Sequence, residues 1–259
     1  MVPRGILTPV LSALALLVTA AAAGPDLRTY GTVDALIRNH DAAPKVVLTE
    51  VLSRPHAYGL GSLSDLRGEI TILDGTAWMS FPPERPGDDR RVEVSRDGAA
   101  EAGFLVAAYV DSAQWKPVKI AGPLASETFD GAFQQLAAQN GLGDAPFPFL
   151  IEGQFPTLTL AIADGRRLAS GPGSEAALQA ANYLEQEVGA GGGVEGTLVG
   201  FYTPTADARF THPGARTHVH AVIPARRATG HAAAFTVAPG ATLWLPIGTP
   251  AGAQGSTGD

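Results

Sequence analysis

The sequence predicts a β-rich α/β protein, in which an N-terminal mixed sheet region is followed by a C-terminal, mainly antiparallel sheet. Short alternating or apolar segments bounded by Gly, Pro and Asp recur along the chain, a pattern typical of strands and turns. These strand patterns cluster on both sides of one expected helix at residues 174–188. The chain has 259 residues, of which 45% are hydrophobic, and this is enough to bury a sizeable core.

The pattern divides the chain into five segments. These are a leader at 1–23, an N-terminal sheet region at 24–164, a helix and glycine-rich connection at 165–195, a C-terminal sheet at 196–248 and a disordered tail at 249–259. The glycine run at 189–193 lacks the preceding strand and the following lysine of a phosphate loop. We therefore interpret it as a flexible connection.

The leader has the form of a secretory signal peptide. Arg4 precedes an apolar run at 11–18, and four alanines at 20–23 supply small residues before Gly24. The apolar run is short for a membrane span. We expect the mature chain to be exported to the periplasm or secreted, without a membrane partner. A leader retained as an N-terminal anchor is the alternative.

Composition excludes several classes of function. The net charge of −7 argues against nucleic acid as a partner, because a phosphate backbone attracts a basic surface. The chain contains no cysteine, so disulfides, thiolate metal ligands and a cysteine nucleophile are excluded. Any bound metal must be held by nitrogen and oxygen atoms.

Several elements are predicted along the chain. Residues 32–37 have helical spacing, and residues 69–73 alternate before an Asp74-Gly75 turn. This alternation places Ile70 and Ile72 toward the core and leaves Glu69 on the opposite face. Further strands are expected at 103–111, 115–120, 197–202, 218–223, 231–237 and 242–247, a helix at 124–140, and a hairpin formed by 147–151 and 157–162.

Histidines are the chemically informative residues. The chain has six, and His218 and His220 occupy alternate positions of an expected strand, so both imidazoles project from one face. His231, on a neighbouring strand, would complete a three-nitrogen site for a divalent ion such as Zn²⁺. The alternative is that the pair is simply a polar strand face. His212 precedes Pro213-Gly214, and we interpret it as a turn residue.

The chain resembles the α-acetolactate decarboxylase family. The resemblance lies in Gly196-Thr197-Leu198-Val199-Gly200-Phe201-Tyr202-Thr203-Pro204, in His218-Val219-His220 and in Gly230-His231. A looser match covers Gly59-Leu60-Gly61-Ser62, Gly68-Glu69 and Leu73-Asp74-Gly75.

The resemblance implies a zinc ion held by His218, His220 and His231. It also implies a lyase that converts 2-acetolactate into acetoin, with the metal acting as Lewis acid and electron sink. Glu69 would move a proton and Ser62 would bond a substrate oxygen. A local bond from Ser62 to the backbone of its own turn is the alternative role.

Two family features lack a counterpart. The family has an arginine in a segment that corresponds to residues near Thr159-Leu160-Ala161, where this chain has none. Arg166 and Arg167 follow and could replace it through a shifted backbone. The family also has a glutamate in its C-terminal tail, whereas Asp259 is the sole acid after His231.

Three functions are therefore open. The first is zinc-dependent decarboxylation of 2-acetolactate. The second is a divergent metalloenzyme that acts on another 2-hydroxy-3-oxo acid. The third is a non-catalytic, exported module that binds metal or a small ligand. The expected partner is a small-molecule 2-hydroxy-3-oxo acid, and a homodimer is one state that the chain could adopt.

Overall fold

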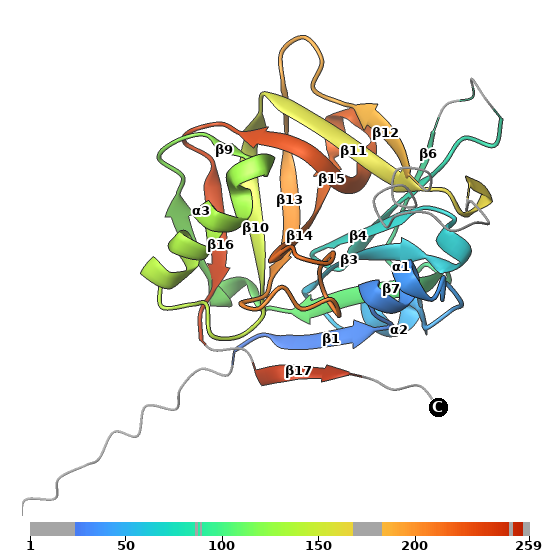
Figure 1. The fold of residues 1–259 in the computed structure, drawn as a ribbon, viewed down its shortest axis with the longest axis horizontal. Helices are drawn as coiled ribbons and strands as arrows, with labels where there is room; N and C mark the ends of the chain where they lie inside the picture. Colours follow the sequence, from blue (N-terminus) through green and yellow to red (C-terminus); the bar gives the residue numbers. More distant parts are fainter. Residues whose placement is uncertain (1–23, 86–87, 89, 168–182, 249–250, 256–259) are drawn as a thin grey trace, which may run out of the picture.

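Two large β-sheets packed face to face form the molecule (Figure 1). The computed structural model describes residues 24–85, 88, 90–167, 183–248 and 251–255. Nearly all strand pairs are antiparallel, which confirms the β-rich fold class; the exception is the parallel pair β1 and β17 in the first sheet. Of the helices in these described ranges, none is long and apolar enough to cross a bilayer. The expected leader at 1–23 lies outside the described residues.

The first sheet has the strand order β17-β1-β7-β3-β4-β5-β6, with β2 paired to β7. Its strands are β1 (Asp26–Tyr30), β2 (Val46–Val47), β3 (Ala57–Leu63), β4 (Glu69–Leu73), β5 (Thr76–Phe81), β6 (Arg91–Ser95), β7 (Glu101–Tyr109) and β17 (Ala251–Gly255). Gly61 lets β3 run close to β7, because a Cβ at this position would lie 2.0 Å from the carbonyl oxygen of Phe104.

The second sheet has the order β12-β11-β15-β14-β13-β10-β16-β8, with β9 paired to β15. Its strands are β8 (Trp115–Lys119), β9 (Leu124–Ala125), β10 (Phe147–Phe155), β11 (Thr157–Ala163), β12 (Tyr183–Glu187), β13 (Val194–Tyr202), β14 (Thr217–Ile223), β15 (Ala228–Val237) and β16 (Thr242–Pro246). The expected boundary near residue 164 differs from the sheet boundary, because β8 to β11 already belong to the sheet that carries the histidines.

Apolar side chains fill three layers. Between the sheets, Leu60 and Phe104 of the first sheet pack with Val199 and Phe201 of the second. Behind the first sheet lies a cluster that includes Ile70 and Ile72, as predicted, and α2 (Leu48–Leu52) covers it. Glu69 and Thr71 alternate with these isoleucines and therefore face the second sheet.

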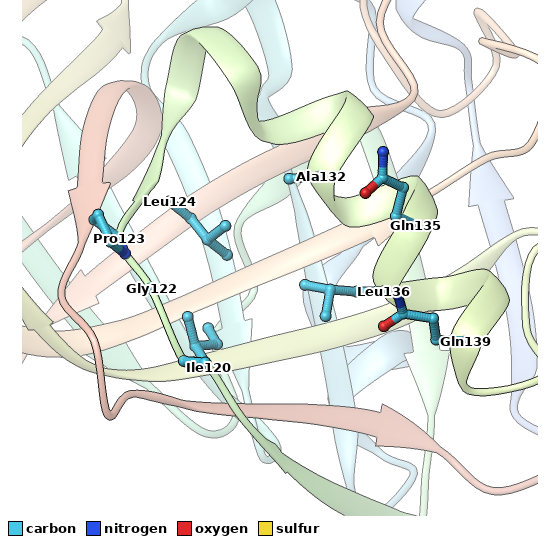
Figure 2. Close-up of a pocket in the computed structure, with 9 residues that line it drawn as sticks. Ile120, Gly122, Pro123, Leu124, Ala132, Gln135, Leu136 and Gln139 are labelled. Carbon is cyan, nitrogen blue, oxygen red and sulfur yellow. The ribbon is translucent and has the colours of Figure 1, made fainter.

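Helix α3 (Ser126–Gln139) covers the outer face of the second sheet and confirms the helix predicted there. Phe129 and Phe133 anchor it, and the Phe133 ring lies 4.1 Å from the Phe149 ring. A cavity of about 240 Å³ lies between α3 and residues 120–124, with Gln135 and Gln139 at its edge (Figure 2). None of the histidines lines this cavity.

The first predicted helix is also confirmed, as α1 (Val33–Arg38). The Thr32 side chain begins the helix by accepting a hydrogen bond from the Ala35 N–H at 3.0 Å. Four short 3₁₀ turns complete the described elements: η1 (Ser64–Leu66), η2 (Ser112–Gln114), η3 (Gly165–Arg167) and η4 (Pro224–Arg226).

Three sequence predictions need correction. The helix expected at 174–188 is wrong for residues 183–187, which form β12; residues 174–182 lie outside the described residues. Pairing with the free edge of β11 outweighs the weak helical preference of this segment. Strands β10 and β11 pair with other strands and form no hairpin. The tail predicted as disordered contains β17, which pairs with β1.

Candidate metal centre

The three histidines expected to bind a metal lie on two adjacent strands, but the group whose nitrogen atoms lie within 4.8 Å of one another contains His218 and His231 and not His220. His218 and His220 lie on β14, and His220 pairs directly with His231 on β15. The ring centroids are 5.2 Å apart for His218 and His220, 5.1 Å for His218 and His231, and 5.6 Å for His220 and His231. Gly230 allows β15 to approach β11 here, because its φ is 153° and a Cβ would lie 2.9 Å from the Ala161 oxygen.

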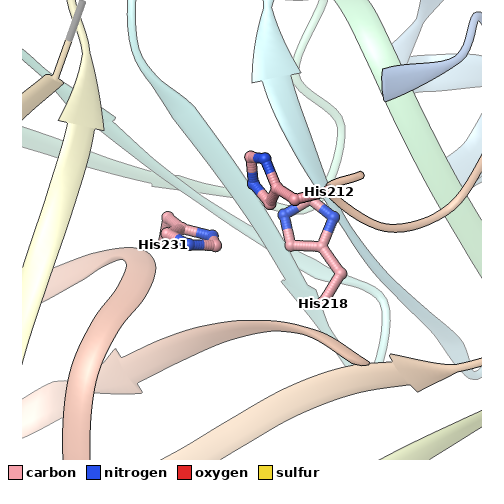
Figure 3. Close-up of side chains that lie close together, drawn as sticks. All are labelled: His212, His218 and His231. Atoms are coloured by element: carbon pink, nitrogen blue, oxygen red, sulfur yellow. The ribbon is translucent and has the colours of Figure 1, made fainter. Parts of the chain in front are cut away.

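His212 joins this cluster from the loop between β13 and β14. Its ring lies 4.9 Å from that of His218 and 5.0 Å from that of His231. Nitrogen atoms of His212, His218 and His231 all lie within 4.8 Å of one another, and Figure 3 shows the three rings facing a common space. The interpretation of His212 as a turn residue is therefore incomplete, since the loop brings its ring to the candidate site.

The loop that carries His212 is anchored at several points. Phe210 is fully buried, the Thr211 hydroxyl donates to the Ala215 carbonyl at 2.7 Å, and the Arg216 N–H donates to Asp130 Oδ2 at 2.7 Å. The crowding of four histidines between residues 212 and 231 was the available signal for His212. Strand periodicity could not place it, because a loop has no period.

The tautomer of His218 is set by the same loop. Its Nδ1 lies 2.9 Å from the carbonyl oxygen of Phe210. A carbonyl can only accept, so Nδ1 carries the hydrogen and Nε2 keeps its lone pair. Phe104 stacks parallel to the ring, with centroids 6.0 Å apart. His218 is thus held as a neutral imidazole with a fixed orientation, as a metal ligand would need to be.

His220 is oriented by two threonines. Its Nδ1 lies 3.3 Å from Thr71 Oγ1, and the Thr229 hydroxyl lies 2.8 Å from both Thr71 Oγ1 and the Ala221 carbonyl oxygen. The Thr229 hydroxyl donates its hydrogen to the Ala221 carbonyl oxygen, so Thr229 Oγ1 can accept a hydrogen bond from the Thr71 hydroxyl. Thr71 can then accept from the Nδ1–H of His220, so the Nε2 lone pair points away from the threonines.

Glu69 faces the cluster from the first sheet. Its side chain is buried, Oε1 accepts the Ala163 N–H at 3.0 Å, and Oε2 lies 3.7 Å from His220 Nε2. Burial raises the pKa of Glu69 well above its ordinary value, and the Ala163 N–H offsets part of this rise. The position predicted for Glu69, on a defined face opposite Ile70 and Ile72, is confirmed.

Ser62 and Ser80 flank Glu69 on the neighbouring strands. Each pairs directly with Glu69 in the sheet, so all three side chains project from the same face. Both hydroxyls are buried without a hydrogen-bond partner among the described residues. The local backbone bond considered for Ser62 is therefore absent from the described structure, and Ser80 is a site residue that the sequence analysis missed.

Tyr183 is a second residue that the sequence analysis missed. It pairs with Ala163 at the start of β12, and its ring lies 6.3 Å from that of His231. Burial raises the pKa of Tyr183, and the nearby Glu69 carboxylate raises it further. The phenol therefore remains a neutral O–H group. Tyr183 was missed because the sequence analysis expected a helix at 174–188, whereas this residue lies on β12 beside β11.

The four imidazoles are uncharged at neutral pH. Burial lowers the pKa of His212 to about 4 and that of His220 to about 3. Burial and repulsion between the rings hold the pKa values of His218 and His231 well below their ordinary value. The Nδ1 atom of His231 is buried and has no hydrogen-bond partner among the described residues. Neutral imidazoles with available lone pairs fit a divalent metal ion.

Arg166 does not provide the expected positive charge at this cluster. Its guanidinium donates to Asp164 at 2.7 and 2.9 Å and to the backbone oxygens of Pro83 and Glu84, and its side chain is exposed. The side chain of Arg167 lies outside the described residues. The histidine cluster and Glu69 are therefore brought together, whereas the Arg166 guanidinium is bonded to Asp164 and to backbone oxygens.

Solved structures share this fold. A Staphylococcus aureus protein of unknown function, described as similar to alpha-acetolactate decarboxylase, matches with a TM-score of 0.64 and 17% identity, over 88% of each chain. The alpha-acetolactate decarboxylase of Bacillus subtilis strain 168 matches with a TM-score of 0.65 and 15% identity, over 90% of each chain.

The sequence comparison gives the family. No curated protein sequence matches the chain. The model of the alpha-acetolactate decarboxylase family, however, matches residues 28–246, a range that includes every candidate site residue named above. By this match over most of its length, the chain belongs to the alpha-acetolactate decarboxylase family.

Proposed function

We propose that this protein is a zinc-dependent lyase that decarboxylates 2-acetolactate to acetoin. The observation that supports the proposal most directly is the cluster of four neutral imidazoles beside the protonatable Glu69. Family membership supplies the substrate class, and the cluster supplies the metal ligands that such a reaction needs.

The metal ligands come from two strands and one loop. His218 and His231 would hold the ion, with His212 and His220 as the further nitrogen ligands. When bound, the ion supplies a Lewis acid that accepts electron density as the carboxylate leaves the substrate.

Glu69 provides the proton in this proposal. Loss of CO₂ leaves its bonding electron pair on the rest of the substrate, which becomes an enediolate. A carbon atom of this enediolate must then be protonated to give the product. Burial raises the pKa of this carboxyl, which favours the protonated form that can donate a proton. The Ala163 N–H fixes Oε1, so Oε2 is the atom that faces the cluster and transfers the proton.

The two flanking serines would bind the substrate. The hydroxyls of Ser62 and Ser80 lie on the same face as Glu69 and have donor hydrogens available. In a site with little water, such a donor aimed at a developing oxyanion is worth more than it would be at the surface. The serines would therefore orient the oxygens of the substrate beside Glu69.

A different 2-hydroxy-3-oxo acid is the second candidate substrate. The observation in its favour is the commitment of Arg166, one of the two arginines that could replace the family arginine, to Asp164 and to backbone oxygens. A substrate with a different acid or alkyl group would suit a site without that charge. A module that binds metal without turnover is the third candidate.

One coupled experiment tests all three candidates. Metal content of the purified protein is measured by mass spectrometry, and acetoin release from racemic 2-acetolactate is followed before and after chelation. Stoichiometric zinc with chelation-sensitive acetoin release supports the proposal. Zinc without acetoin but with CO₂ release from a homologous acid supports the second candidate. Zinc without any turnover supports a binding module, and a protein that binds no divalent metal contradicts the proposal.

We also propose that the chain is exported by its leader at 1–23. The motivation is the arrangement of Arg4, the apolar run at 11–18 and the alanines at 20–23. N-terminal sequencing of the mature protein from a secreting host tests it. An uncleaved chain in the membrane fraction would instead support the retained anchor.

A further inference from the structure

A second polar cavity lies outside the metal centre, where the edges of the two sheets meet. Its volume is about 310 Å³, and its polar lining consists of Arg90, Gln186, Arg226, Arg227 and Thr229. Arg90 immediately precedes β6 of the first sheet, whereas Arg226 and Arg227 lie between β14 and β15 of the second. None of the histidines and neither Glu69 nor Ser62 lines it.

The cavity concentrates positive charge in an acidic protein. Three guanidinium groups line it without any carboxylate, although the whole chain carries a net charge of −7. None of these three arginines takes part in an ion pair within the part of the chain that the structure describes. The nearest acid in sequence on β6, Glu93, pairs with Arg91 instead.

Neutral acceptors hold Arg90 in place. Its Nη1 donates to Gln186 Oε1 at 3.0 Å and its Nη2 to the carbonyl oxygen of Glu185 at 2.6 Å. Burial lowers the pKa of Arg90. The charge of Arg90 is therefore positioned across the gap between the sheets without being neutralised.

Arg227 is held in an unfavourable backbone conformation. Its φ of 46° and ψ of 50° lie in the left-handed region, where glycine or asparagine is more favourable than a long side chain. Its Nη2 donates to the Val92 carbonyl oxygen at 3.2 Å, which spans from the second sheet to the first. Strain of this kind concentrates at functional positions, and here it directs a third positive charge toward the cavity.

We propose that this cavity binds a small multivalent oxyanion, either a di- or tricarboxylate or a phosphate compound. Guanidinium groups bind carboxylate and phosphate through paired N–H donors, and three of them compensate two or three negative charges. The volume is at the lower end of small-molecule sites, which restricts the ligand to a compact metabolite. The cavity shares Thr229 with the residues that orient His220, but its ligand would differ from the substrate of the proposed decarboxylation.

Isothermal titration of the full-length protein with tricarballylate and with inorganic phosphate tests the proposal. Sodium chloride at matched ionic strength is the blank. We expect saturable binding of one equivalent of at least one of the two anions, and the anion that binds identifies the source of the negative groups. Arg90→Gln and Arg226→Gln should each weaken binding at least tenfold.

Three further variants make the test specific. Arg38→Gln removes an exposed arginine that pairs with Asp34 and does not line the cavity, and this variant should bind the anion as the wild type does. Arg227→Gly removes a guanidinium and relieves the positive φ, so it should weaken binding while the thermal midpoint is unchanged or higher. His218→Ala should leave anion binding intact.

Three results would overturn the proposal. The first is the absence of saturable binding of both anions. The second is equal loss of binding in the Arg38 and Arg90 variants, which would indicate a general charge effect. The third is loss of binding in the His218 variant, which would place the anion on the metal centre.

Discussion

Glu69 Oε2 and His220 Nε2 face each other at 3.7 Å across the space between the two sheets. The two atoms are placed as in an ion pair, but neither group carries the charge that an ion pair requires. Burial raises the pKa of Glu69 well above its ordinary value and lowers the pKa of His220 to about 3. In the metal-free protein the proton therefore stays on the carboxyl group, and the imidazole is neutral.

Replacement of Glu69 by glutamine should separate proton transfer from metal binding. Glutamine keeps the size of the side chain and can still accept the Ala163 N–H, but it has no acidic proton. We expect Glu69→Gln to retain its zinc and to lose about 10²–10⁴-fold in kcat for acetoin release. Steady-state kinetics with metal analysis of the same sample measure both. Turnover at the wild-type rate would leave Glu69 with a structural role.

Ser62→Ala should affect activity without affecting stability. The Ser62 hydroxyl is buried and has no hydrogen-bond partner among the described residues, so its removal leaves no other group unpaired. We expect the free energy of unfolding to stay within about 0.5 kcal/mol of the wild type or to rise. The KM or kcat for acetolactate should worsen. A marked fall in stability with unchanged kinetics would argue for the local structural role.

The metal affinity of single histidine variants should rank the four ligands. His218→Ala is expected to lose the metal, because it removes an oriented nitrogen at the centre of the cluster. His212→Ala should also weaken zinc binding, measured by competition with a chromophoric chelator. His40→Asn is the control, since His40 is exposed and its φ of 52° suits asparagine. Wild-type affinity in the His212 variant would exclude His212 as a ligand.

The metal-free protein should lose stability on acidification from pH 6.5 to about pH 4. In this range the histidines bind protons in the unfolded chain but stay neutral in the folded one, because their folded pKa values are lowered. Each contributes at most about 1.4 kcal/mol of lost stability per pH unit.

Glu69 acts in the opposite direction, since a raised folded pKa makes stability fall as pH rises above about 4.5. One carboxyl does not outweigh four imidazoles. Urea midpoints of chelated protein at pH 7, 6 and 5 measure the net effect. His212→Asn should reduce the slope, and a midpoint independent of pH would contradict the predicted burial of neutral histidines.

Phe133→Ala should destabilise the fold while leaving the metal site intact. Phe133 lies on the buried face of α3, is fully buried, and contacts the rings of Phe129 and Phe149. Truncation of a buried phenylalanine to alanine leaves a cavity and lowers the free energy of unfolding by about 3–5 kcal/mol. Chemical denaturation measures the loss, and zinc stoichiometry of the folded variant serves as the control. A loss below about 1 kcal/mol would mean that α3 can collapse onto the sheet.

Periodicity explains which parts of the site were predictable. His218, His220 and Glu69 lie on strands whose alternation fixes the face of each side chain. The facing of each side chain was therefore predictable from the sequence, whereas the place of Glu69 near the site came from the family resemblance. Ser62 came from the family resemblance, and direct pairing with Glu69 explains its place. Ser80 belongs to no sequence motif, and its place beside Glu69 follows from the pairing of β5 with β4.

Residues outside this periodicity were misplaced. His212 lies in a loop, and its position depends on the anchoring of Phe210 and Arg216, which no local pattern encodes. Tyr183 was assigned to a helix because the gain from edge pairing with β11 is a tertiary effect. The sheet boundary was misplaced for a related reason, because strand order depends on long-range pairing rather than on position in the chain.

The bond from His218 to the Phe210 carbonyl oxygen links the protonation of a candidate metal ligand to the main chain. Any residue type that preserves the path of the loop supplies the same acceptor. Substitution scanning at position 210 would therefore report on the buried ring and not on the carbonyl. An amide-to-ester replacement between residues 210 and 211, made by protein semisynthesis, would weaken that acceptor and also remove the Thr211 N–H that donates to the Asp207 carbonyl oxygen at 3.1 Å. The zinc affinity of this variant would report the combined effect of both bonds.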